Sequence, residues 1–366
     1  MNLNEDQQYW VAFSRIPKIG ATRLARLYSF FSSMQEAWQA SFSDLMASGL
    51  EEKIVNEFFS EKDSTNPGAE WEKLEKENIK VVTIGDKYYP KLLKEIWNPP
   101  SLLYYKGTLP ENEEYTIGVV GTRKISNYGK QIIPQIVNDL VKNGFSIVSG
   151  LALGVDALAH KITVDCKGKT VAVLGSGIDE QSIYPTQNRY LASEIIKNDG
   201  AVISEYPLGT MAFPGNFPFR NRIISGLSLG TLVIEAAEES GALITAKYAL
   251  DQNREVFAVP GSIFSPTSAG PNKLIKMGAR VVTSIEDILE TLNLANATEF
   301  IKNKKIIPQS PEEEKISNIL TQEPMHIDKV ILGSGLDAAR VGAILTLMEM
   351  KGIVKNLGGM NYILIR

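Results

Sequence analysis

Between residues 80 and 283, short runs of β-branched and other apolar residues alternate with stretches of helical spacing. The runs lie at 81–84, 117–120, 146–148, 171–174, 201–203, 231–234, 256–259 and 280–283. Strands that alternate with helices predict crossover units and a mostly parallel sheet with helices on both faces. Such an α/β sheet binds ligands outside the carboxyl ends of its strands. We therefore expect the functional residues in the loops that follow these runs.

Residues 1–66 predict a separate helical domain, because apolar residues recur there at helical spacing. Within it, residues 16–24 are similar to the turn of a helix-hairpin-helix module, with Lys18 in place of the first of its two usual glycines. Such a turn presents backbone amides to a phosphate. Both DNA contact and a plain packing or partner-docking role stay open for this domain. The breaker-rich segment 63–68 marks the boundary to a second domain over 67–295.

Residues 296–310 lose periodicity and predict a linker, and residues 311–366 predict three helices followed by a hairpin around Gly358 and Gly359. Three helices and a terminal hairpin are typical of a winged helix. Acidic and basic residues nearly cancel over this segment, and its expected recognition helix is mostly apolar. These features favour protein contact over reading of a DNA groove.

Composition excludes several classes of protein. The net charge of the 366 residues is -4, so any attraction to nucleic acid must come from a local basic cluster. One cysteine and two histidines exclude an internal disulfide and predict no metal centre and no bound cofactor. The N-terminus lacks a secretory pattern, and no apolar run reaches the roughly 18 residues that cross a bilayer. We therefore expect a cytoplasmic protein with no membrane partner.

Small residues follow three of the expected strands and predict phosphate-binding loops. Their backbones can approach an anion closely, and the helix that follows each loop directs its positive end toward that anion. The phosphate-loop residues are Gly121, Thr122, Ser149, Gly150, Gly175, Ser176 and Gly177. In the same region Asp156 is expected to cap a helix, and His160 is expected to be structural.

Residues 213–226 interleave aromatic rings with two arginines. Arg220 and Arg222 are expected to bind phosphates, and Phe217 is expected to stack on a base. The rings of Phe213 and Phe219 are expected to fill the core instead. The complete expected set of DNA-binding residues is Arg123, Lys124, Phe217, Arg220, Asn221, Arg222 and Lys247.

The ordered set of motifs resembles the DNA-processing protein A family (DprA, also called Smf). The motifs include Gly121-Thr122-Arg123, the loops at 149–156 and 175–179, Phe217-Pro218-x-Arg220-Asn221-Arg222, and Val259-Pro260-Gly261. The resemblance implies a Rossmann-like domain that binds single-stranded DNA without reading its sequence and that forms a homodimer. It also implies protection of incoming DNA and loading of the RecA recombinase during natural transformation.

Two other functions are alternatives to this one. The sheet is also similar to that of phosphoribohydrolases, nucleotide-processing enzymes in which Glu205 or Glu235 would act on the ribose of a nucleoside monophosphate. Those enzymes show a Pro-Gly-Gly-x-Gly-Thr loop, which this chain lacks. A transcription factor centred on the winged helix would explain none of the central loops. We therefore expect a binding protein, without catalytic residues, and not an enzyme.

Overall fold

The computed structural model describes residues 3–110, 115–294, 310–321, 324–350 and 354–364. The chain divides into two compact units, 1–292 and 293–366. The linker expected over 296–310 lies, except for its last residue, outside the described residues.

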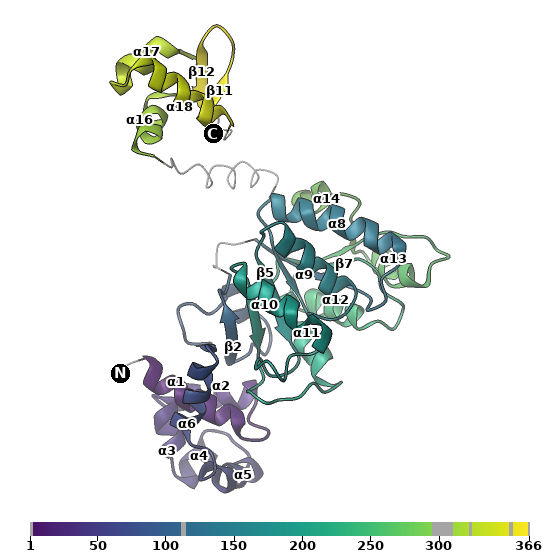
Figure 1. The fold of residues 1–366 in the computed structure, drawn as a ribbon. Helices are drawn as coiled ribbons and strands as arrows, with labels where there is room; N and C mark the ends of the chain where they lie inside the picture. Colours follow the sequence, from purple (N-terminus) through teal and green to yellow (C-terminus); the bar gives the residue numbers. More distant parts are fainter. Residues whose placement is uncertain (1–2, 111–114, 295–309, 322–323, 351–353, 365–366) are drawn as a thin grey trace. The chain divides into compact units, whose positions relative to one another are not determined.

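A nine-stranded sheet forms the centre of the first unit (Figure 1). The strand order is β1-β2-β6-β5-β4-β3-β7-β8-β9. All neighbours from β6 to β9 are parallel, whereas β2 pairs antiparallel with both β1 and β6. The strands are β1 (Lys80–Thr83), β2 (Leu102–Gly107), β3 (Thr116–Val120), β4 (Ser146–Ser149), β5 (Thr170–Leu174), β6 (Ala201–Ser204), β7 (Gly230–Val233), β8 (Glu255–Ala258) and β9 (Arg280–Val281). The prediction of a Rossmann-like, mostly parallel sheet is confirmed.

The edge formed by β1 and β2 differs from the uniform alternation that the sequence runs suggested. Between these two strands the chain forms only the single turn α7 (Lys91–Lys94), not a crossover helix that would return it to a parallel position. The strand β2 was not among the expected runs. Only Ser101 separates its first residue, Leu102, from the two prolines at 99 and 100.

Helices cover both faces of the sheet. Alternate residues of β5 belong to different cores: Ala172 and Leu174 pack in one cluster, and Val171 and Val173 in the other. The helices α8, α9 and α10 pack side by side, and α11 packs on α12 (Figure 1). The helices are α8 (Asn127–Lys142), α9 (Val155–Asp165), α10 (Arg189–Lys197), α11 (Asn216–Gly226), α12 (Gly241–Asp251), α13 (Ala269–Lys276) and α14 (Ile285–Thr291). The doubly wound arrangement explains why the central strands are apolar on both faces.

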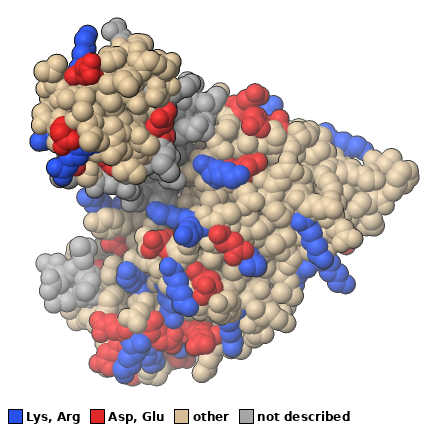
Figure 2. Space-filling model, turned by 45° about the horizontal axis from the view of Figure 1, so that its top comes forward, with Lys and Arg blue, Asp and Glu red and all other residues tan. Residues whose placement is uncertain are grey.

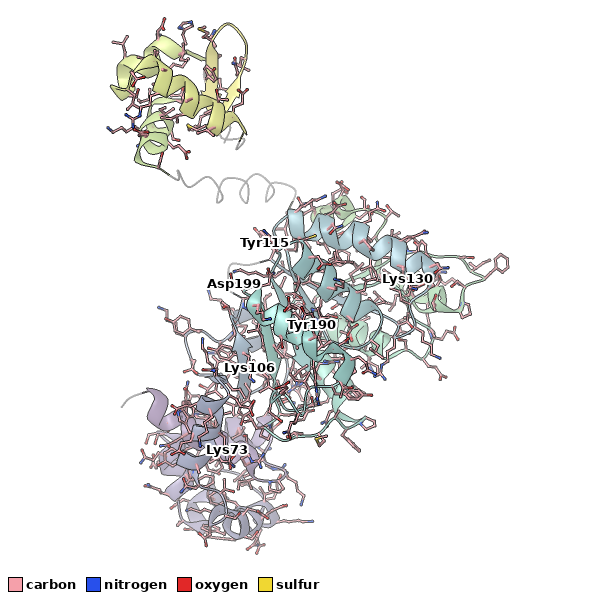
Figure 3. All side chains as sticks on the ribbon, viewed as in Figure 1. Lys73, Lys106, Tyr115, Lys130, Tyr190 and Asp199 are labelled. Atoms are coloured by element: carbon pink, nitrogen blue, oxygen red, sulfur yellow. The ribbon has the colours of Figure 1, made fainter. Side chains whose placement is uncertain are left out.

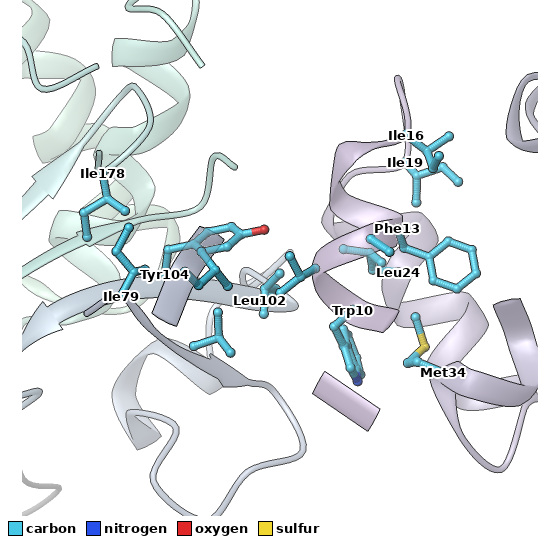
Figure 4. Packing of buried hydrophobic residues seen from close by; sticks show 14 of the residues in the cluster. Trp10, Phe13, Ile16, Ile19, Leu24, Met34, Ile79, Leu102, Tyr104 and Ile178 are labelled. Carbon is cyan, nitrogen blue, oxygen red and sulfur yellow. The ribbon is translucent and has the colours of Figure 1, made fainter. Parts of the chain in front are cut away.

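The N-terminal helices share a core with the sheet rather than standing apart from it. One hydrophobic cluster runs from Trp10 and Phe13 through Leu102 and Tyr104 to Ile178 (Figure 4). The helices are α1 (Leu3–Arg15), α2 (Ala21–Phe30), α3 (Met34–Gln39), α4 (Phe42–Ala47), α5 (Glu52–Lys62) and α6 (Pro67–Lys76). Because α6 packs on α1, it extends the helical layer past residue 66. The domain boundary expected there stays a prediction.

The helical layer contains the hairpin that the sequence suggested. The turn at 16–20 joins α1 to α2, and Lys18 takes a left-handed conformation with φ of 65°. A glycine adopts this conformation without strain, which explains why the related motif carries one at this position. The hairpin therefore forms although its first glycine is missing.

The second unit is a winged helix. It contains α16 (Pro311–Ile319), α17 (Ile327–Ser334), α18 (Ala338–Met350), β10 (Met325–His326), β11 (Val354–Asn356) and β12 (Asn361–Leu364), with strand order β10-β12-β11. Its core includes Ile316, Val330, Leu345 and Val354. In the described part of the chain no single helix is long and apolar enough to cross a membrane, although the bent pair α17 and α18 passes that test by length and composition.

Candidate nucleic-acid interface

The candidate site lies beyond the carboxyl ends of β3 and β7, where the strand order reverses. The strands β4, β5 and β6 extend the sheet on one side of β3, and β7 and β8 extend it on the other. Open parallel sheets bind ligands at such a switch point. Gly121 follows β3, and a Cβ atom there would lie 2.5 Å from Val155 and 2.8 Å from the carbonyl oxygen of Glu235. The tight packing at this position therefore requires a glycine.

Glu235, which closely follows β7, is a structural anchor. Its side chain is buried and accepts hydrogen bonds from the backbone N–H of Ser126 (3.0 Å), the hydroxyl of Thr267 (2.9 Å) and the hydroxyl of Ser126. Its carbonyl oxygen also accepts the N–H of Thr122 at 2.7 Å. These bonds hold the start of α8 and the turn at 265–268 against the end of β7. A carboxylate with three donors is poorly placed to act on a ribose.

A cavity of about 430 Å³ opens at this switch point, a volume typical of ligand sites. We call it the switch-point cavity. It is lined by Val120, Gly121, Arg123, Ala152, Asp156, Tyr184, Pro214, Phe217, Pro218, Arg220, Asn221, Ile224, Ser240, Gly241, Ala242 and Thr245. The loops that follow β3, β4, β5, β6 and β7 all contribute to it.

Three side chains at the cavity combine positive charge with aromatic surface. The guanidinium carbon of Arg123 lies 5.7 Å from the centroid of the Phe217 ring, and the Tyr184 ring lies 5.8 Å from the same centroid. Gly175 leaves space for Phe217, because a Cβ there would lie 2.9 Å from the ring. Rings of this kind stack on unpaired bases, and an exposed arginine binds the adjoining phosphates. Both Arg123 and Tyr184 are exposed.

Arg220 supplies a fixed charge at the wall of the cavity. It is 5% exposed, and its guanidinium donates to the carbonyl oxygens of Gly150 (2.8 Å) and Val173 and to the side-chain oxygen of Asn221 (3.2 Å). Burial lowers the pKa of Arg220 to about 10, and the charge of Asp156 opposes this shift. The guanidinium therefore stays protonated at neutral pH and is held in one place by the sheet.

Asp156 and His160 stabilise the loop behind Arg220. Asp156 was expected to cap α9, and this expectation is wrong, because the cap residue is Gly154, whose φ of 83° suits glycine. The Asp156 carboxylate instead accepts the N–H of Gly150 at 3.1 Å, and burial raises its pKa. His160 is fully buried with its Nδ1 2.7 Å from the hydroxyl of Thr170, and burial lowers its pKa to about 3. It is therefore a neutral residue of the core.

Arg222 lies on the other side of α11 and does not line the switch-point cavity. It is 3% exposed, pairs with Glu205 at 2.7 Å, and stacks on Phe219 with its guanidinium carbon 4.1 Å from the ring centroid. Its Nε and Nη1 atoms have no hydrogen-bond partner among the described residues. The phosphate contact expected of Arg222 stays a prediction, and in this geometry the side chain positions Phe219 and Glu205.

The remaining predicted residues lie outside the cavity or behind its wall. Lys124 and Lys247 are exposed but do not line it. Of the phosphate-loop residues, only Gly121 belongs to the lining. The others pack behind the lining and form hydrogen bonds within the protein. For example, the N–H of Gly177 donates to the carbonyl oxygen of Thr210 (2.8 Å), and the hydroxyl of Ser149 donates to the carbonyl oxygen of Val119 (2.6 Å). Direct phosphate contacts by Thr122, Ser149, Gly150, Gly175, Ser176 and Gly177 stay predictions.

Two aromatic side chains differ from expectation, and a third was missed. Phe213 is 65% exposed and Phe219 is 41% exposed, so the expectation that they fill the core is wrong. Ile223 and Ile224, farther along α11, fill the core instead, because the buried part of this helix begins only at Arg220. Tyr184 was not among the predicted binding residues, because nothing in its local sequence shows that it approaches Phe217.

Comparison with known proteins identifies the family. Residues 80–293 match the family model of DNA recombination-mediator protein A, and residues 302–360 match the DprA winged helix domain. The chain is 36% identical to Protein Smf of Synechocystis over 98% of its own length and 99% of that protein.

Two solved structures agree with this family assignment. DNA processing protein A from Streptococcus pneumoniae superposes with a TM-score of 0.67 at 33% identity, covering 79% of this chain and 98% of that one. A structure described as showing the single-stranded DNA binding mode of DNA processing protein A from Helicobacter pylori superposes with a TM-score of 0.51 at 30% identity. The superposition covers 59% of this chain and 95% of that one. Because the family model matches residues 80–293 and the Synechocystis relative is matched along nearly its whole length, the chain belongs to the DNA recombination-mediator protein A (DprA/Smf) family.

Proposed function

We propose that this protein binds single-stranded DNA, without reading its sequence, in the switch-point cavity. The observation that carries the proposal is the grouping of Arg123, Phe217 and Tyr184 at the mouth of a cavity whose wall contains the buried charge of Arg220. A single strand exposes both base faces and phosphates, so it can use the rings and the guanidinium groups together. The relative from Helicobacter pylori, which is described as binding single-stranded DNA, supports the choice of ligand.

The charge of the molecule is consistent with a local interface. The net charge is -4, and on the face drawn in Figure 2 basic and acidic side chains are interspersed. Attraction to a phosphate backbone must therefore come from individual sites rather than from a general positive field. We expect binding to weaken with salt by an amount that corresponds to few phosphate contacts.

In the cell, the proposed role is that of a recombination mediator in the cytoplasm. The bound strand would be protected and passed to the RecA recombinase during DNA uptake by natural transformation, as membership of the family suggests. We also propose a homodimer formed through the Rossmann-like domain. Ile263 and Phe264, which are 85% and 90% exposed in the loop after β8, support a protein contact on this domain, because large exposed apolar side chains mark interfaces.

We propose binding rather than catalysis because the two glutamates available for ribose chemistry have structural partners. Glu235 accepts three hydrogen bonds from the fold, and Glu205 is paired with Arg222 at 2.7 Å. A hydrolase would need one of them beside the ribose of a nucleotide in the switch-point cavity, and neither lines that cavity.

A titration of labelled oligonucleotides, followed by fluorescence anisotropy, tests the proposal. The full chain should bind a single-stranded oligonucleotide more tightly than the same sequence as a duplex, with affinity that falls as salt increases. A parallel assay should detect no hydrolysis of nucleoside monophosphates. Equal affinity for both DNA forms, or release of free base, would overturn the proposal.

A further inference from the structure

A second cavity, which we call the hairpin cavity, lies where the α1–α2 hairpin meets the sheet. Its volume is about 590 Å³. Residues 14–24 and Arg26 line it from the helical layer, and Asn98, Ser101, Glu205, Tyr206, Pro207 and Phe219 line it from the sheet. The switch-point cavity shares none of these residues. The function proposed above leaves this cavity unassigned.

The lining of the hairpin cavity carries a local excess of positive charge. Four basic residues, Arg15, Lys18, Arg23 and Arg26, face two acidic ones, Glu51 and Glu205. Each of the four basic side chains has an acidic partner and is 31% to 53% exposed. The pairs are Arg15 with Glu70 (3.5 Å), Lys18 with Glu57 (2.8 Å), Arg23 with Glu51 (2.9 Å) and Arg26 with Glu51 (4.0 Å). Exposed pairs of this kind contribute little to the stability of the fold, because water and salt screen them. A phosphate can therefore replace the carboxylates at small cost.

The backbone of the hairpin adds donors to this charge. Gly20 precedes α2 and provides no side-chain cap for the first turn of that helix. The residues of this turn, Ala21 and Thr22, line the cavity together with Gly20. An uncapped helix start directs its N–H groups and its positive dipole toward whatever occupies the space in front of it.

One continuous segment of chain connects the two cavities. Residues 205–207 line the hairpin cavity and Pro214 lines the switch-point cavity. On the first turn of α11, Phe217 and Pro218 line the switch-point cavity, whereas Phe219 lines the hairpin cavity. Between these points Met211 and Phe213 are 68% and 65% exposed. The segment 205–219 therefore contributes to both cavities and carries exposed apolar side chains between them on which bases can pack.

We propose that a bound single strand continues from the switch-point cavity across residues 205–219 into the hairpin cavity. There its phosphates contact Lys18, Arg26 and the start of α2. The proposal depends on single-strand binding at the switch point and extends it to a second contact surface on the helical layer. It predicts that long oligonucleotides gain affinity from the hairpin and that short ones do not.

The test uses the full chain with oligothymidylates of about 4 and about 16 nucleotides, the range of footprints known for single-strand grooves. The variant Lys18→Gln/Arg26→Gln removes two charges of the hairpin cavity. The control Lys73→Gln/Lys76→Gln removes two exposed, ion-paired lysines of α6 that line a different hollow. Figure 3 labels Lys73 on this helix. Thermal melting confirms that both variants are folded.

We expect the hairpin variant to bind the long oligonucleotide about tenfold more weakly and to lower its salt slope by about 1.4, or about 0.7 for each lost phosphate contact. Its affinity for the short oligonucleotide, and both affinities of the control, should not change. Unchanged affinity for the long oligonucleotide, or an equal loss of affinity for both lengths, would overturn the proposed contact at the hairpin cavity. The proposed binding at the switch-point cavity would stand. Failure of the unmodified protein to bind either length would overturn the proposed function itself.

Trp97 provides a second readout that does not depend on charge. It precedes Asn98, which lines the hairpin cavity, and it is 89% exposed, whereas Trp10 and Trp38 are buried. The long oligonucleotide should quench tryptophan emission, and Trp97→Phe should remove most of the quenching. A long oligonucleotide that binds tightly without quenching would contradict the proposed path.

Discussion

The guanidinium carbon of Arg123 lies 5.7 Å from the centroid of the Phe217 ring, which brings a residue that follows β3 against one that begins α11. The contact joins loops from two different crossover units, and Tyr184 approaches the same ring from a third. A cation over an aromatic face is stabilised by the ring quadrupole. The pair therefore orders both side chains before a strand binds.

Removal of the Phe217 ring should weaken single-strand binding. We expect Phe217→Ala to cost about 1–3 kcal/mol of binding free energy, which is the range for loss of one stacking platform. Anisotropy titrations at fixed salt measure the change. Tyr190→Ala, which removes an exposed ring of α10 (Figure 3) that does not line the cavity, is the matched control and should bind normally. An effect of similar size in both variants would contradict the stacking role.

Arg220 should contribute to stability as well as to binding. Arg220→Met would leave the carbonyl oxygens of Gly150 and Val173 without their donor and Asp156 without its counter-charge. Loss of one partner from a buried charged network typically costs about 3–5 kcal/mol. Urea unfolding should show this loss of stability. Arg220→Lys keeps the charge but not the planar guanidinium, so its stability should lie between those of the parent and of Arg220→Met. A Met variant as stable as the parent would show that the network is not a determinant of the fold.

His160 should make stability depend on pH. Burial and the nearby charge of Arg220 lower its pKa from 6.5 to about 3 in the folded state, so the unfolded chain binds a proton first. The contribution of neutral His160 to the free energy of unfolding is complete above pH 6.5 and is lost as the pH falls toward 3. The free energy of unfolding then falls by up to about 1.4 kcal/mol per pH unit.

The variant His160→Asn isolates this effect. Its amide N–H can replace the donor to the Thr170 hydroxyl, which itself donates to the carbonyl oxygen of Ile147. Urea unfolding at about pH 7 and about pH 5.5 should show a smaller loss of stability in the variant than in the parent. Parallel losses in both proteins would show that other groups dominate this pH range.

The sequence was sufficient to predict the parallel part of the sheet, because buried parallel strands are apolar on both faces and produce runs such as Val171 to Leu174. It did not predict β2, which pairs antiparallel with both of its neighbours. It also predicted that Arg123 and Phe217 lie at the same edge of the sheet, at the carboxyl ends of its strands. It could not predict that Arg222, on α11, is buried. The ion-pair partner of Arg222 is Glu205, which lies 17 positions away along the chain, directly after β6. Nor could it predict the exposure of Phe213 or the approach of Tyr184 to Phe217, because both depend on how loops that are distant in the sequence meet in the fold.

The hairpin at Lys18 offers a stability test of local conformation. A residue with a Cβ pays roughly 1–2 kcal/mol for the left-handed region, whereas glycine does not. We expect Lys18→Gly to raise the free energy of unfolding by up to about 1 kcal/mol, after loss of the exposed ion pair with Glu57. Lys18→Ala loses the same ion pair but keeps the Cβ, so it should be slightly less stable than the parent. Equal stability of the Gly and Ala variants would contradict the strain at this position.

The winged helix should contribute little to single-strand affinity. It forms a compact unit of its own, and its α18 exposes Ala339, Ala343 and Leu347, with Arg340 paired to Glu312 at 3.1 Å. A helix face of this composition lacks the cations that bind phosphates. A chain ending at residue 294 should therefore keep its affinity for single-stranded oligonucleotides within about tenfold, equivalent to about 1.4 kcal/mol. A larger loss in anisotropy titrations, with the melting temperature of the first unit unchanged, would assign a direct DNA contact to the winged helix.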